Sequence, residues 1–592
     1  MFAVRTVLRS NSCLPQFSAR HRSTCSHQQP EALRKLLRVL KQSQLRQRLS
    51  SSQWSSPNVV KSIYPDEPLP PGSFTDYLWS RMDGWKDETA LICGVSGRQM
   101  SYNEVRRQCR NFGASLRREL NLKTDDRLGV LLPNIMEYYP TAFGAMEAGI
   151  VPSPMNPIYK PDEVAHQLLD CEASAIVTLH QLLPTVQKAI EIAGLGKLKI
   201  IVVGNDTSTN GTISFKDLIG NGDTSQLEDV RRCHDDMAII PYSSGTTGRP
   251  KGVVLTHGNL TANLFGLDRG KDHIVRTEIL ATSKEVIPLI LPLFHIYGLA
   301  IASLTILTGG EAVLLPKFEE ETFVNSLKNA TVLYVAPPLV IYLGNSPKVT
   351  EETLKSVRTV VSGAAPVGQA DIDKVLKKMP GALYKQGYGL TETSPLVCTT
   401  PITVYNPTSI GPPAVNTKVK VVDVETGQAA GPEESGEIVV KGPQVMKGYW
   451  KNQKATDEVL KDGWFYTGDI GHYDSKGYFY ITDRVKELIK VKGFQVAPAE
   501  LEAVLRGHPD VADAGVVGAP DPLKGEKPVA FIVLKANVQP NPETLKAYVV
   551  EKLAKYKRIE DFIFVESVPK SAAGKILRKE LRLMVKERFP KA

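Results

Sequence analysis

Residues 241–252 read Pro-Tyr-Ser-Ser-Gly-Thr-Thr-Gly-Arg-Pro-Lys-Gly, and no other dozen residues say as much about this chain. Small side chains let the backbone close around an anion, while N–H groups, hydroxyls and Lys251 can donate to phosphate oxygens. The common P-loop has a different spacing and opens a helix, whereas this loop leads into an apolar run, residues 252–255, that predicts a strand. We therefore expect a phosphate-binding loop that works without a helix dipole; a polar linker is the alternative.

Two later segments carry groups suited to nucleotide chemistry. In residues 386–393, Gln-Gly-Tyr-Gly-Leu-Thr-Glu-Thr, the ring of Tyr388 can stack on a purine, and Thr391 and Glu392 offer a hydroxyl and a carboxylate. Mg²⁺ takes few protein oxygens beside phosphates and water, so one Glu suffices. Asp469, at the end of Gly-Trp-Phe-Tyr-Thr-Gly-Asp, can accept hydrogen bonds from both ribose hydroxyls. An exposed acidic turn is the alternative for Glu392.

Residues 569–575, Pro-Lys-Ser-Ala-Ala-Gly-Lys, place Lys575 on a loop before a predicted helix, residues 576–585. Gly574 frees the backbone there so that the lysine can project. A surface lysine is the alternative. Residues 361–366, Val-Ser-Gly-Ala-Ala-Pro, form a turn of small side chains against which a flat group could lie, although a tight strand-to-helix turn would need the same residues.

Together these motifs resemble the adenylate-forming superfamily, which includes acyl-CoA synthetases, 4-coumarate–CoA ligases, beetle luciferases and peptide-synthetase adenylation domains. The resemblance runs from about Tyr64 to about Val585. It implies an ATP-dependent carboxylic acid–CoA ligase, nearest the 4-coumarate-ligase-like branch, that forms acyl-AMP with release of pyrophosphate and then an acyl-CoA. A luciferase-like monooxygenase acting on an acyl adenylate and an adenylation module loading a carrier protein are the alternatives.

The resemblance also implies residue roles. Catalytic roles go to Lys575, Thr391, Glu392 and His295, with Glu392 as the Mg²⁺ ligand; by its sequence context alone, His295 would more often be a core residue. The ATP and AMP contacts would be Ser243, Ser244, Gly245, Thr246, Thr247, Lys251, Gly363, Ala364, Gln386, Gly387, Tyr388, Thr391, Asp469, Arg484, Lys486, Lys490, Gln495 and Lys575. The CoA contacts would be Lys317, Lys492 and Gly493. The acyl pocket would be lined by Tyr297, Gly363, Ala364, Gly387, Gly389, Pro395 and Leu396, which leaves medium-chain, long-chain and aryl acids open.

The distribution of apolar runs predicts the domain organisation. Short apolar runs alternate with amphipathic segments over residues 73–484, as in an α/β fold. The resemblance implies that this part is a large multi-layer AMP-binding domain. Residues 485–592 are predicted to form a small α+β unit, which the resemblance implies is a mobile lid hinged near Lys486. Residues 51–72, rich in Ser and Pro, are expected to be a linker.

The net charge of +9 lies entirely in residues 1–50, which hold ten Lys and Arg against the single acid Glu31. The remaining 62 basic and 62 acidic residues balance, which argues against a nucleic-acid-binding protein. Residues 1–50 are Arg- and Ser-rich, and Leu33, Leu36, Leu37 and Leu40 have helical spacing, which is typical of a mitochondrial transit peptide. We expect a mitochondrial matrix location, with the cytoplasm as the alternative.

The seven cysteines are scattered and form no Cys-x-x-Cys pair, so neither a disulfide framework nor a zinc site is expected. No apolar run approaches 18 residues, so no transmembrane helix is expected. The resemblance implies a small carboxylic acid, ATP and CoA as the partners, and the oligomeric state stays open.

Overall fold

The computed structural model describes residues 54–56, 58–204, 211–243, 250–269, 284–401, 406–484, 487–491, 494–521, 523–571 and 574–588. Residues 53–592 group as one unit. Within the described residues, no helix is long and apolar enough to cross a membrane.

The first layer is a five-stranded parallel sheet in the order β6-β5-β7-β8-β9. Neighbouring residues of its strands face opposite ways. Ile176 packs in a small core with α6 and α7, whereas Val177 packs in the main core with α4 and α5. The short apolar runs at 175–178 and 199–203 lie in strands β7 and β8. The elements are α4 (Tyr102–Arg118), β5 (Arg127–Leu131), α5 (Tyr138–Glu147), β6 (Val151–Pro154), α6 (Pro161–Asp170), β7 (Ala173–Leu179), α7 (Leu183–Ala193), β8 (Lys199–Val203), β9 (Thr212–Ser214) and α8 (Phe215–Gly220).

Two four-stranded sheets follow, β13-β14-β3-β4 and β15-β16-β17-β18. In the second, β16 and β17 run parallel, so the segments 361–366 and 386–393 come together where these neighbouring strands end. The carboxyl edge of parallel strands is where α/β sheets bind ligands. The elements are β3 (Thr89–Cys93), β4 (Gln99–Ser101), β13 (Val286–Leu289), α10 (Ile296–Thr308), β14 (Glu311–Leu314), α11 (Glu320–Leu327), β15 (Val332–Val335), α12 (Pro337–Asn345), β16 (Thr359–Ser362), α13 (Gln369–Lys377), β17 (Leu383–Gly389) and β18 (Leu396–Thr399).

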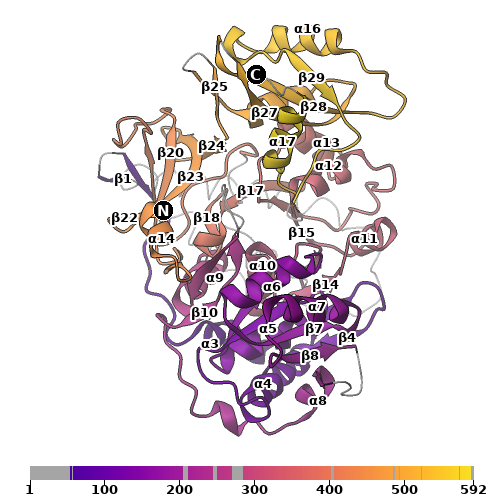
Figure 1. Cartoon of the computed structure of the whole chain (residues 1–592), viewed down its shortest axis with the longest axis vertical. Helices are drawn as coiled ribbons and strands as arrows, with labels where there is room; N and C mark the ends of the chain where they lie inside the picture. Colours follow the sequence, from indigo (N-terminus) through magenta and orange to yellow (C-terminus); the bar gives the residue numbers. More distant parts are fainter. Residues whose placement is uncertain are drawn as a thin grey trace, which may run out of the picture. The chain divides into compact units, whose positions relative to one another are not determined.

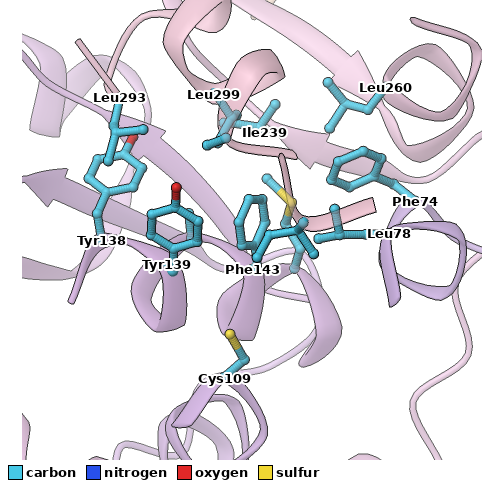
Figure 2. Close-up of a cluster of buried hydrophobic side chains, with 14 of the residues drawn as sticks. Phe74, Leu78, Cys109, Tyr138, Tyr139, Phe143, Ile239, Leu260, Leu293 and Leu299 are labelled. Carbon is cyan, nitrogen blue, oxygen red and sulfur yellow. The ribbon is translucent and has the colours of Figure 1, made fainter. Parts of the chain in front are cut away.

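The segment after the phosphate loop is a strand, β12 (Lys251–Thr256), as predicted, and α9 (His257–Arg269) follows it directly. Strand β12 pairs with β10 (Met237–Ile239), β11 (Tyr242–Ser243) and β21 (Gly448–Tyr449). Helices α9 and α10 pack against each other and against α3 (Phe74–Trp79). Figure 2 shows this contact, with Phe74, Leu260 and Leu299 near one another.

A seven-stranded sheet corrects the linker prediction for part of residues 51–72. Strands β1 (Trp54–Ser56) and β2 (Val59–Lys61) belong to it, and β2 pairs with β19 (Lys418–Val422). Val60 is fully buried among the apolar residues of this sheet. The pairing partner, β19, lies more than three hundred residues further along the chain, so no local sequence pattern predicts strand β2. The other strands are β20 (Gly436–Lys441), β22 (Leu460–Lys461), β23 (Trp464–Tyr473) and β24 (Phe479–Arg484).

The C-terminal residues form the α+β arrangement that the sequence predicts, drawn in orange to yellow in Figure 1. One five-stranded sheet has the order β26-β25-β28-β27, with β29 beside β28. Along the chain, helix α15, strands β27 and β28, helix α16 and strand β29 follow one another, as in a small α+β unit. Lys486, the predicted hinge, lies outside the described residues. The elements are β25 (Ile489–Val491), β26 (Phe494–Val496), α15 (Pro498–Arg506), β27 (Val511–Asp521), β28 (Gly525–Leu534), α16 (Pro542–Lys552), β29 (Asp561–Phe564) and α17 (Arg578–Arg588).

Candidate active site

A pocket lies where β16 and β17 end beside α10. All seven residues predicted for the acyl pocket line it, as do Thr391, Tyr388, His295 and Lys575. The described lining residues are Leu267, His295, Tyr297, Ala300, Ile301, Tyr334, Val361, Gly363, Ala364, Gly387, Tyr388, Gly389, Leu390, Thr391, Pro395, Leu396, Thr399 and Lys575.

Close backbone approach requires glycine at position 389, and Gly363 lies against the ring of Tyr297. A Cβ on Gly389 would lie 1.7 Å from the carbonyl oxygen of Pro395, and one on Gly363 would lie 3.1 Å from Cε1 of Tyr297. Because 1.7 Å is far inside van der Waals contact, any side chain at Gly389 would force the strand apart. The tight wall also holds Tyr297, whose hydroxyl donates to the carbonyl of Val361 at 3.4 Å.

Glu392 is buried, with 8% of its surface exposed, at the point where the phosphate loop meets β21. Ser243 and Tyr449 both donate to its Oε1 at 2.9 Å. The ring of Tyr449 also carries the ammonium of Lys251, 4.8 Å from the ring centroid. The predicted phosphate lysine and the predicted metal carboxylate are therefore neighbours. Ser244, Gly245, Thr246 and Thr247 lie outside the described residues.

The surroundings of Glu392 fit a Mg²⁺ ligand. Within the described residues, no group of three or more His, Cys, Asp or Glu side chains could hold a metal ion by itself. A single buried carboxylate fits the way Mg²⁺ is held when most of its ligands are phosphates and water. Ser243 and Tyr449 both donate to the same carboxylate oxygen, Oε1, so the other oxygen, Oε2, accepts from neither of them.

Asp469 is nearly fully buried and accepts from two of the other predicted nucleotide residues. The hydroxyl of Tyr388 donates to Oδ2 at 2.7 Å, and Nε of Arg484 lies 3.0 Å from Oδ1. The charge of Asp469 raises the pKa of Arg484, while burial, followed by the same carboxylate, raises the pKa of Tyr388 well above its usual value. Each carboxylate oxygen has a second lone pair, so Asp469 can still accept from ribose hydroxyls.

Lys575 is a cation of the pocket whose pKa is shifted strongly by its surroundings. Burial, aided by repulsion from Arg484, lowers its pKa to about 8, while Asp469 and Glu392 act in the opposite direction. His295 lines the same pocket, and burial together with the charge of Lys575 lowers its pKa to about 4. Its Nδ1 accepts from the backbone N–H of Tyr297 at 3.2 Å. His295 is thus a neutral imidazole near pH 7.

Other predicted nucleotide and CoA residues lie away from the described pocket wall. Gln386 is buried and donates to the carbonyl of Pro407 at 2.7 Å. Lys490 is exposed. The side chain of Lys317 is 76% exposed and lies 2.7 Å from Glu319. Lys486, Lys492, Gly493 and the side chain of Gln495 lie outside the described residues.

Several residues of the site were not predicted from the sequence. Tyr449 follows a glycine in the two-residue strand β21, and only the pairing of β12 with β21 brings it to Glu392. Leu267, Ala300 and Ile301 belong to apolar helices whose residues are mostly core. Helical spacing from Tyr297 was the one available signal, since Ala300 and Ile301 follow it at i+3 and i+4.

Comparison with known proteins identifies the family of the chain. The family described as AMP-binding enzyme matches residues 78–450, and the AMP-binding enzyme C-terminal domain matches residues 500–575. A protein named 4-coumarate–CoA ligase 2 from Oryza sativa subsp. japonica is 37% identical over 544 residues, covering 88% of this chain and 94% of its own. A protein of the same name from Solanum tuberosum is 38% identical over 535 residues, covering 88% and 96%.

Among solved structures, the anthranilate CoA ligase AuaEII in complex with anthranoyl-AMP superimposes with a TM-score of 0.80 at 27% identity, covering 88% of this chain and 99% of its own. The family match extends over more than half of the chain and includes the phosphate loop, Thr391 and Glu392. The chain therefore belongs to the AMP-binding enzyme family, the adenylate-forming superfamily that its motifs resemble.

Proposed function

We propose that this protein is an ATP-dependent carboxylic acid–CoA ligase. It joins a carboxylate to AMP, with release of pyrophosphate, and then transfers the acyl group to CoA. The observation that carries the proposal is the meeting of Lys575, from the C-terminal part of the chain, with Thr391 and His295 in one pocket whose inner wall is apolar. Joining a carboxylic acid to a phosphate requires a cation and a hydroxyl for the phosphate oxygens and an apolar cavity for the acyl group.

In the first step a carboxylate oxygen attacks the α-phosphorus of ATP, and the bond to the pyrophosphate oxygen breaks. Catalysis of such a transfer depends on positioning and on neutralising phosphate charge. Lys575 and Thr391 would face the α-phosphate, and Lys251 the departing phosphates. Glu392 would hold Mg²⁺, which supplies further positive charge to the phosphate oxygens. Asp469 would fix the ribose.

In the second step the CoA thiolate attacks the acyl carbonyl and AMP leaves. This step forms no new negative charge on pyrophosphate, so it does not need Lys575. Because His295 is neutral, it would not form an ion pair with the CoA thiolate that holds the thiolate away from the acyl carbonyl. We propose that the C-terminal domain turns about Lys486, so that its CoA-binding residues Lys492 and Gly493 take the place of Lys575 and face Lys317 of the AMP-binding domain.

A direct test combines a substrate panel with a half-reaction assay. CoA-dependent AMP release should be measured with acetate, hexanoate, palmitate, benzoate and coumarate. Lys575→Ala should cripple acyl-AMP formation but spare thioester formation from a synthetic acyl-AMP. Loss of both half-reactions alike would remove Lys575 from its role. Light emission with a luciferin, or acyl transfer only to a carrier protein, would favour the alternatives.

We also propose a mitochondrial matrix location, because residues 1–50 carry the whole charge excess and none of the motifs. The proposal concerns only this leader, which lies outside the described residues. Cytoplasmic staining of the tagged full-length protein would overturn it.

A further inference from the structure

A second, smaller cavity lies behind the acyl pocket, between α3, α9 and α10. Two residues, Leu267 of α9 and Ala300 of α10, line both cavities. They therefore form the wall between the acyl pocket and the space behind it. The residues around the second cavity are Phe74, Leu260, Asn263, Leu264, Leu267, Ile296, Leu299, Ala300, Ser303 and Ser394.

Helix geometry explains why the second cavity exists. Leu260, Asn263, Leu264 and Leu267 are spaced at i, i+3, i+4 and i+7 on α9. Four cavity residues of α10, beginning at Ile296 and ending at Ser303, repeat the same spacing. Residues at this spacing share one helix face, so each helix turns a continuous stripe toward the other. The α10 stripe includes the small residues Ala300 and Ser303, which leave the space between the two helices incompletely filled.

The second cavity is chemically suited to an apolar group. The hydroxyl of Ser303 donates to the carbonyl of Leu299 at 2.8 Å, and that of Ser394 donates to the carbonyl of Gln444 at 2.9 Å. The amide of Asn263 bonds backbone groups of residues 393–396. A buried water needs two to four polar partners, and these side chains already have theirs.

We propose that Leu267 is the residue that limits the length of the acid: an apolar acyl tail ends against its side chain, and the second cavity is the space beyond the limit. The other shared residue, Ala300, contributes only a methyl group fixed on α10. Leu267 is 5% exposed and lies near the C-terminal end of α9. Because its side chain is larger than that of Ala300, it makes most of the wall. The inference rests on the proposed ligase function and names the determinant of its substrate length.

The test uses non-reactive acyl-AMP analogues, alkyl sulfamoyl adenosines of 4 to 14 carbons, and measures their dissociation constants by calorimetry on the full chain. In the wild type, affinity should rise with each methylene until the tail meets Leu267 and then stop rising. Leu267→Ala should move that limit to longer tails. Two further buried methylenes, at about 0.8 kcal/mol each, correspond to a gain of roughly 15-fold for an analogue two carbons past the wild-type limit.

Two variants separate this effect from general loss of packing. Leu304→Ala makes the same change on α10 at a buried residue outside the described walls of both cavities, and should leave the length limit unchanged. Ser303 lines only the second cavity. Adding Ser303→Leu to Leu267→Ala should therefore refill the new space and restore the wild-type length limit. By itself it should not alter the limit.

An unchanged length limit in Leu267→Ala, with all analogues still bound, would overturn the inference, and so would the same shift in Leu304→Ala. The fate of the proposed function is read separately, from thioester formation by the wild type. Active thioester formation with an unmoved limit refutes only the role of Leu267. No thioester from any acid refutes the ligase function itself.

Discussion

Raising the pH from 7 to 9 should slow acyl-AMP formation, because Lys575 loses its proton over this interval. Its pKa is lowered to about 8 by burial and by Arg484, so the free enzyme carries the charge below pH 8 and loses it above. About nine-tenths of Lys575 is protonated at pH 7 and about one-tenth at pH 9. We therefore expect kcat/KM for ATP in the first half-reaction to fall roughly tenfold across this interval. His295, with a pKa of about 4, stays neutral throughout.

The assay should measure pyrophosphate release without CoA at subsaturating ATP, because the CoA thiol ionises in the same range and would speed the second step. At saturating ATP the bound phosphates should hold the proton on Lys575, so kcat should fall only at higher pH than kcat/KM does. This split distinguishes titration of a group that faces ATP from a general loss of structure.

Lys575→Arg is the matched control, because a guanidinium stays protonated over the whole interval. The variant should be slower, since its fork differs in shape, but its pH profile should be flat between 7 and 9. A flat wild-type profile would refute the argument. An equal decline in Lys575→Arg would assign the decline to another group.

Three further predictions concern the metal ligand, the hinge and the leader. Glu392→Gln keeps an acceptor for Ser243 and Tyr449 but removes the charge, so adenylation should fall by roughly 100-fold and a Mg²⁺ titration should shift to higher concentration; a shift no larger than that of Tyr449→Phe would count against metal binding. Lys486→Pro should let acyl-AMP form and accumulate while acyl-CoA release drops by orders of magnitude, because proline fixes φ; normal turnover would place the hinge elsewhere. Deleting residues 1–50 should preserve ligase activity and leave a tagged protein in the cytosol, and unaltered import would refute the leader hypothesis.

The sequence alone determined the fold class, several strands and helices, and the composition of the phosphate loop. These features are local. Glycines, hydroxyls and Lys251 stand within one dozen residues, and strand and helix periodicities show within ten. Thr391, Glu392 and Lys575 were found because each stands in a short motif of distinctive composition. The same locality explains the linker error, because β2 is identified by β19, not by its neighbours in the chain.

Only the tertiary structure decided how the charges and the pocket are arranged. The lowered pKa of Lys575 and the neutrality of His295 follow from burial and from charges contributed by segments far apart in sequence. Tyr449 reaches Glu392 through a strand pairing, and Leu267 becomes a wall only because α9 packs beside α10. Desolvation and side-chain contact depend on which segments meet in space, and the order of residues along one segment does not specify that.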